Sequence, residues 1–96
     1  MSSELVAIEE FDATDMVLRE VLRDVLGLAP ERLAALTRES GLFGHLPELD
    51  SMAVAGLLTE IEDRFGFVIE DDDVDSEMLE TYGALLGFVT AKLGVG

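Results

Sequence analysis

An aspartate and a serine stand side by side where a helical pattern begins, as Asp50 and Ser51. A short side-chain oxygen at this place can accept a hydrogen bond from the free N–H groups of the first turn, so either residue can serve as the N-cap. A serine hydroxyl at a helix start is also accessible to a partner. The Asp50 carboxylate would lie near the positive end of the helix dipole, and it could help to hold a metal ion that an incoming enzyme brings. On these two residues alone, a plain N-cap is the simpler interpretation.

The helix behind this pair is predicted to run to Phe65. Its apolar residues recur with the spacing of one buried stripe; they are Val54, Leu57, Leu58, Ile61 and Phe65. A second set lies about half a turn away and is expected to face solvent; it consists of Met52, Gly56, Thr59 and Asp63. Small and apolar residues near the serine, followed by carboxylates, suit a helix on which a partner docks.

A first helix is expected to begin at an N-cap, Asp12 or Thr14, and to stop at Gly27. Its buried stripe is predicted to comprise Leu18, Val21, Leu22 and Val25, with Arg19, Glu20, Arg23 and Asp24 on a solvated face. The preceding residues 1–11 are expected to form a tail, which leaves residues 12–94 as the folded domain.

A last helix is expected to be capped by Thr81 and to end at Gly94. Its buried stripe is predicted to be Tyr82, Leu85, Leu86, Val89 and Leu93. No strand pattern stands out. Three long helices and a short one therefore predict an all-α fold, an antiparallel four-helix bundle.

Residues 29–49 form a long connection, in which Pro30 can open a short helical turn. The apolar side chains expected to anchor this loop to the bundle are Leu42, Phe43, Leu46 and Leu49. A loop this long inside a small domain usually has a functional reason. Here that reason would be the presentation of Ser51.

Composition narrows the possible functions. The 96 residues suit one domain, 49% of them are hydrophobic, and the chain has no cysteine, so any thiol used in function must come from a cofactor. The 21 acidic and 6 basic residues give a net charge of −15. This charge argues against binding to nucleic acid or anionic membranes, and it favours partners with basic docking surfaces. No apolar run is long enough to insert into a membrane, and we expect a cytoplasmic monomer.

Asp50-Ser51-Met52, followed by the helix from Ala53 to Phe65, resembles the modification site of the acyl carrier protein family. The resemblance covers the chain from about Asp12 to Leu93. It implies that Ser51 carries a covalent 4'-phosphopantetheine arm through a phosphodiester, and that the thiol of the arm holds acyl groups as thioesters. It also implies a carrier rather than an enzyme, with the short helix placed just before Thr81 and with Val74, Met78 and Leu79 turned inward.

The same resemblance implies which proteins bind. A phosphopantetheinyl transferase would modify Ser51, with Asp50 as a possible magnesium ligand during the reaction. Acyl-activating and acyl-transferring enzymes would dock on the following helix; the positions implied are Met52, Ala55, Thr59, Glu62 and Asp63. The chain departs from the common pattern at Glu48, where a glycine is frequent, and at Ala53 and Gly56, which are often acidic in fatty-acid carriers. The residues at 53 and 56 weaken the case for the general fatty-acid synthase as the client and suggest a dedicated pathway, so fatty-acid, polyketide and dedicated lipid or secondary-metabolite pathways all stay open.

Three other functions share part of this pattern. An aminoacyl or peptidyl carrier of a non-ribosomal pathway would share the serine, but the strong acidity favours acyl groups. An unmodified acidic helical adaptor would keep the charge and the bundle without needing Ser51. A serine hydrolase would need a base and an oxyanion hole, and the lone His45 has no third group to support it. Asp71, Asp73 and Asp75 have calcium-loop spacing but lack the required glycine and glutamate, so no metal site is expected.

Overall fold

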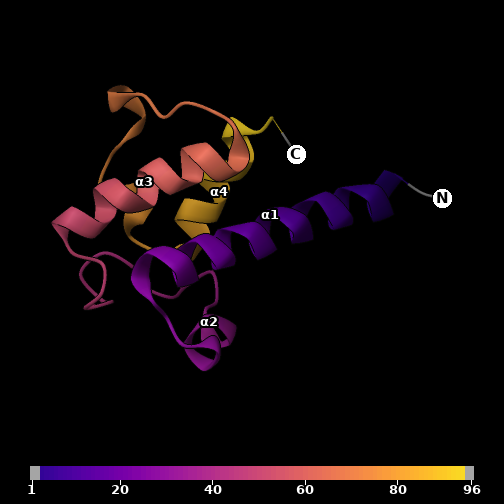
Figure 1. Ribbon diagram of the computed structural model, residues 1–96. Helices are drawn as coiled ribbons and strands as arrows, with labels where there is room; N and C mark the ends of the chain where they lie inside the picture. Colours follow the sequence, from indigo (N-terminus) through magenta and orange to yellow (C-terminus); the bar gives the residue numbers. More distant parts are fainter. Residues whose placement is uncertain (1–2, 95–96) are drawn as a thin grey trace.

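A computed structural model of the chain describes residues 3–94, with side chains from residue 13 onward. This part of the chain is helical, with four α-helices, α1 (Ser3–Leu26), α2 (Pro30–Ala35), α3 (Ser51–Phe65) and α4 (Tyr82–Lys92). Two single 3-10 turns, η1 (Asp71–Asp73) and η2 (Glu77–Leu79), lie between α3 and α4. Helices α1 and α3 run antiparallel, while the short α2 lies at the C-terminal end of α1 (Figure 1). The all-α bundle is therefore confirmed.

Packing around α1 forms the core. Its stripe of Leu18, Val21 and Leu22 is fully buried against α3 and α4, and Val25 is half-buried. The counterparts on the other two long helices are Leu57 and Ile61 of α3 and Tyr82, Leu85, Leu86 and Val89 of α4, all buried. Val54, Leu58, Phe65 and Leu93 lie at the edge of this core and are partly exposed. The helical periodicity thus predicted the buried faces correctly.

Glycines and a side-chain cap define the helix ends. Gly27, Gly66 and Gly94 all have a left-handed φ between 69° and 74°, which only glycine adopts readily, and each follows a helix. The Thr81 side chain accepts a 3.1 Å hydrogen bond from the Ala84 amide and caps α4 as predicted. Within residues 3–94, no helix is both long and apolar enough to cross a membrane.

The start of α1 differs from the prediction. Neither Asp12 nor Thr14 is an N-cap, because α1 is continuous from Ser3. Residues 3–26 contain neither proline nor glycine, so nothing in the backbone interrupts the helix. The N-terminal part of α1 extends beyond the bundle (Figure 1). Residues 1–2 lie outside the described part, and a domain boundary at residue 12 stays a prediction.

The segment before α4 also differs. A short helix was expected there, but the chain forms the 3-10 turns η1 and η2, and the short α-helix is α2. Met78 and Leu79 are buried as predicted, whereas Val74 is 39% exposed. Val74 follows η1 in an extended conformation, which turns it toward the surface beside Ser51. Phe43, an expected loop anchor, is likewise 47% exposed, while Leu42 and Leu49 are buried.

Candidate functional site

Ser51 is the first residue of α3, and Asp50 is its N-cap. The Asp50 Oδ1 atom accepts a 2.8 Å hydrogen bond from the Ala53 amide, and the Asp50 carbonyl accepts one of 3.0 Å from Val54. Asp50 has extended backbone geometry, so the chain enters the helix abruptly at this residue. With the capping role taken by Asp50, the Ser51 hydroxyl is exposed at the positive end of the helix dipole. The predicted accessibility of the serine is confirmed.

An apolar groove of about 380 Å³ opens beside Ser51. Its lining residues come from three segments of the chain and are Phe43, Ser51, Val54, Val74, Asp75, Ser76 and Leu79. The exposed positions of Phe43 and Val74 are explained by this groove, since both side chains form its walls. A flexible group attached to the Ser51 oxygen would have apolar surface within reach and open solvent on the other side. The site therefore fits a phosphopantetheine arm sterically.

Backbone hydrogen bonds hold the groove wall that carries Phe43. The amides of Leu42 and Phe43 donate to the carbonyls of Glu80 and Leu79, at 3.0 and 2.9 Å. Gly41 and Thr81 form an isolated antiparallel bridge at the same place. The connection before α3 is thus attached to the residues that lead into α4, and the two loops that border the groove form one unit.

The long connection also packs against the first turn of α4, at Gly83. The Gly83 amide donates a 3.0 Å hydrogen bond to the Arg38 carbonyl. A Cβ atom at Gly83 would lie only 2.8 Å from that carbonyl oxygen, closer than real Cβ atoms approach. Gly83 therefore permits close packing of the long connection on α4.

Most of the predicted docking residues share the open face of α3. Met52 is 86% exposed, and Ala55, Thr59 and Asp63 are exposed as well. The Thr59 hydroxyl donates a 3.0 Å hydrogen bond to the Ala55 carbonyl of the same helix. These four residues are brought together along one helix face, on the side of α3 that does not pack on the core.

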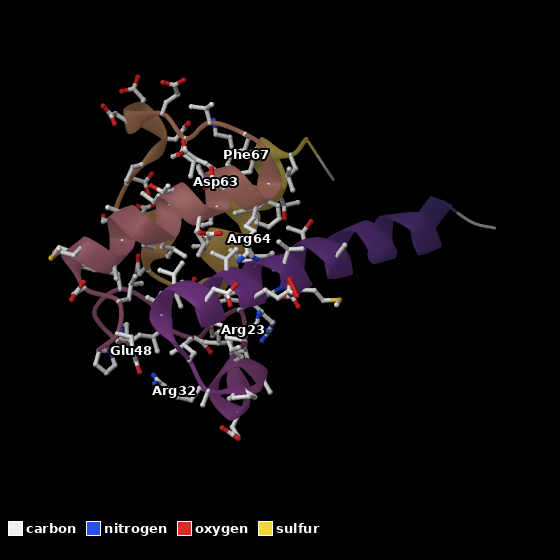
Figure 2. The ribbon with its side chains drawn as sticks, in the orientation of Figure 1. Arg23, Arg32, Glu48, Asp63, Arg64 and Phe67 are labelled. Atoms are coloured by element: carbon white, nitrogen blue, oxygen red, sulfur yellow. The ribbon has the colours of Figure 1, made fainter. Side chains whose placement is uncertain are left out.

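Glu62 has a structural role that the sequence did not indicate. Its Oε2 atom accepts a 2.7 Å hydrogen bond from the Ile69 amide and ties the segment after α3 back to the helix. The side chain is half-buried, in contrast to its exposed neighbour Asp63. Figure 2 shows Asp63 and Phe67 near the C-terminal end of α3. The two adjacent carboxylates therefore have different surroundings, and Asp63 alone is fully available on the surface.

Arg19 was expected on a solvated face, but it is packed among three elements. Its Nε atom donates to Asp15 at 3.1 Å, and its Nη atoms donate to the carbonyls of Leu33 and Leu36 around α2. The guanidinium also lies 4.9 Å from the centre of the Tyr82 ring, close enough for a cation–π contact. Arg19 thus joins α1, α2 and α4, a role that depends on tertiary packing and leaves no local signal in the sequence.

A second arginine acts closer to Ser51. Arg32 of α2 and Glu48, three residues before Ser51, face each other across the connection (Figure 2). Each Nη atom of Arg32 donates to a different oxygen of Glu48, and one of these distances is 3.0 Å. The Arg32 guanidinium holds the pKa of Glu48 below its ordinary value. In the sequence, Glu48 stands out only as a departure from the common glycine, and no pattern pairs it with Arg32.

No metal centre emerges from the described side chains, residues 13–94. They contain no group of three or more His, Cys, Asp or Glu residues placed to hold an ion. Asp73, one of the three residues with calcium-loop spacing, pairs instead with Lys92 at 2.7 Å and accepts from the Glu70 amide. The Lys92 ammonium lowers the pKa of Asp73. His45 is exposed in the turn after Phe43.

Comparison with known proteins identifies the family. The family model described as the phosphopantetheine attachment site matches residues 17–89. Among solved structures, the chain is similar to the solution NMR structure of a holo acyl carrier protein from Nitrosomonas europaea. The two are 45% identical, with a TM-score of 0.74, over 81% of this chain and 93% of that one. A search of curated proteins gave no match. The chain therefore belongs to the phosphopantetheine-binding family of acyl carrier proteins, which bear a covalent phosphopantetheine and act as carriers, not enzymes.

Proposed function

We propose that Ser51 is the phosphopantetheine attachment residue and that the chain carries acyl groups as thioesters. The observation that carries this assignment is the place of the Ser51 hydroxyl. It is exposed on the first residue of α3, it is free of the capping role that Asp50 performs, and it borders an apolar groove. The attached group supplies the thiol, which the protein cannot provide because it has no cysteine.

Modification requires a transferase and coenzyme A. The Ser51 oxygen bonds to the phosphorus that bears the pantetheine, the P–O bond that joins this phosphorus to the rest of the diphosphate breaks, and adenosine 3',5'-bisphosphate leaves. The serine proton passes to a base of the transferase. Asp50, whose second carboxylate oxygen is not used in the cap, is in place to contact a magnesium ion brought by the transferase.

Partner enzymes are proposed to dock on the open face of α3, formed by Met52, Ala55, Thr59 and Asp63. The exposed Met52 offers apolar contact near the arm, and Asp63 offers charge further along the helix. A net charge of −15 favours partners with basic surfaces, whose association should weaken with added salt. Once a partner is docked, the arm keeps the acyl group at high local concentration near its active site. The missing acidic side chains at Ala53 and Gly56 support a dedicated pathway.

Intact mass after incubation with coenzyme A, Mg²⁺ and a broad-specificity phosphopantetheinyl transferase tests this proposal. The parent protein should gain the mass of one phosphopantetheine, and Ser51→Ala should gain none. Ser76→Ala is a matched control, because Ser76 is also exposed and lines the same groove. If folded, unmodified parent gains no mass with several transferases, the assignment fails and the acidic adaptor becomes the better hypothesis.

A further inference from the structure

Arg32 and Glu48 join α2 to the segment that leads into Ser51, although they are 16 positions apart in the sequence. Two parallel N–H···O contacts between a guanidinium and a carboxylate fix direction as well as distance, because both groups are planar. Arg32 and Glu48 keep 44% and 30% of their side-chain surface exposed. The contact therefore lies at the surface, outside the apolar core.

The helix that carries Arg32 is itself held in place. Arg19 of α1 donates hydrogen bonds to the carbonyls of Leu33 and Leu36, which belong to α2 and its C-cap. The Leu36 side chain is buried in the core, and Leu33 packs against it. Since α2 is only six residues long and buries no side chain of its own fully, these contacts rather than helix propensity fix its position.

Very little chain separates Glu48 from the proposed attachment site. Leu49 follows and is buried, and then Asp50 begins the hydrogen bonds of α3. On the other side of Glu48, the turns of residues 42–49 are closed by backbone hydrogen bonds of Leu46 and Leu49. The contact with Arg32 therefore restrains the backbone at Glu48, on the solvent-facing side of the segment before Ser51. Leu49 restrains the same segment from the core side.

We propose that Arg32 and Glu48 are a positioning pair that holds the segment before Ser51 in the conformation a phosphopantetheinyl transferase recognises. This inference rests on Ser51 being the attachment residue. Neither side chain touches a reacting atom, and their effect passes through the backbone of Leu49 and Asp50. The pKa of Glu48 is lowered because Arg32 stabilises the charged carboxylate, which agrees with an ion pair that is intact at neutral pH.

Transferase kinetics on four variants test the pair. Arg32→Gln and Glu48→Gln each remove the ionic contact, and the double variant Arg32→Glu/Glu48→Arg restores it with the charges exchanged. Arg23→Gln is the matched control, because Arg23 is an exposed arginine that pairs with Asp24 on its own helix. We expect kcat/KM for the carrier to fall about fivefold in both single variants, the factor that a well-formed exposed ion pair can supply. The exchanged pair should recover most of the loss, and the control should match the parent.

Amide hydrogen exchange gives a readout that does not need the transferase. Exchange at Leu49 to Val54 should quicken in both single variants and return in the exchanged pair, while the thermal unfolding midpoints stay close to that of the parent. Unchanged kcat/KM in both single variants overturns the proposal, whatever the exchange rates. So does a loss in Glu48→Gln that Arg32→Gln does not share, since Glu48 would then contact the transferase itself. If the parent is not modified at all, the assignment of Ser51 fails, and exchange alone decides whether the pair positions the segment.

Discussion

The Tyr82 hydroxyl donates a 2.5 Å hydrogen bond to Asp15 Oδ1, which joins the first residue of α4 to the middle of α1. The same Asp15 carboxylate accepts from Arg19, whose guanidinium lies over the Tyr82 ring. Tyr82 is buried, with 1% of its surface exposed, so its polar atom needs the partner that Asp15 supplies. Asp15, Arg19 and Tyr82 thus connect α1 to α4 at the point where Arg19 also reaches α2.

Alkaline titration should reveal this contact directly. Burial and the neighbouring Asp15 carboxylate raise the pKa of Tyr82 well above its ordinary value. A phenol with a raised pKa in the folded state adds stability that is complete below its unfolded pKa of about 10, and that stability is lost as the pH rises further. Tyr82 is the one tyrosine of the chain, which has no tryptophan, so tyrosinate absorbance reports on it alone. We expect this absorbance to appear together with loss of helical circular dichroism. Tyrosinate forming near its ordinary pKa in an intact helical protein would contradict the contact.

Two glycines of α4 should respond oppositely to alanine. Gly83→Ala places a Cβ atom against the Arg38 carbonyl, and the resulting shift should cost about 1–3 kcal/mol. Gly87→Ala meets nothing within 4 Å and lies inside the helix, so it should stabilise by up to about 1 kcal/mol. Urea unfolding of both variants provides the measurement. Equal effects of the two substitutions would show that the connection does not pack on Gly83.

Asp50 caps α3 and is also proposed to contact the magnesium ion of the transferase. Substitution by Asn separates these two roles. Asn caps helices about as well as Asp, so Asp50→Asn should keep the stability of the parent, while Asp50→Ala should lose about 1 kcal/mol. Both variants lack the carboxylate, and both should be modified by the transferase more slowly if Asp50 contacts its magnesium ion. Thermal unfolding and transfer rates are to be compared on the same samples. A parent-like transfer rate in Asp50→Asn would limit Asp50 to the cap.

Glu62 and Asp63 provide another matched pair. Glu62→Ala removes the acceptor of the Ile69 amide and should destabilise the fold by about 1 kcal/mol. Asp63→Ala should change stability by less than about 0.5 kcal/mol, because Asp63 is exposed. Affinity for a basic partner enzyme should fall in Asp63→Ala, and the salt dependence of binding should become shallower. A partner that binds Asp63→Ala as tightly as the parent would place the docking contacts elsewhere on α3.

Local patterns predicted the features that depend on local physics. Asp50, Thr81 and Gly66 mark helix ends because capping and left-handed backbone are decided within a few residues. The buried stripes followed from helical periodicity in the same way. Val74 was misplaced because a helix was expected around it, whereas it lies in extended backbone between two 3-10 turns.

The contacts that position the candidate site were largely beyond sequence reasoning. Arg19 looks like a surface arginine until α2 places two carbonyls within reach. Glu48 and Arg32 likewise have no helical or strand spacing that would pair them. By contrast, the exposure of Ser51 and Met52 was predictable, because Ser51 stands at the start of a helix and Met52 lies on the open side of an amphipathic helix.

The cap at Asp50 also sets the direction in which Ser51 points about the axis of α3. Because Ser51 is the first residue of α3, the direction of its hydroxyl about the helix axis is decided by where the helix begins. A start displaced by one residue would turn the proposed attachment point by about 100°, since an α-helix has 3.6 residues per turn. The side chains of the docking face belong to the same rigid helix. A partner that binds the proposed docking face would therefore meet the proposed attachment residue at a fixed angle about the helix axis, without a separate step of alignment.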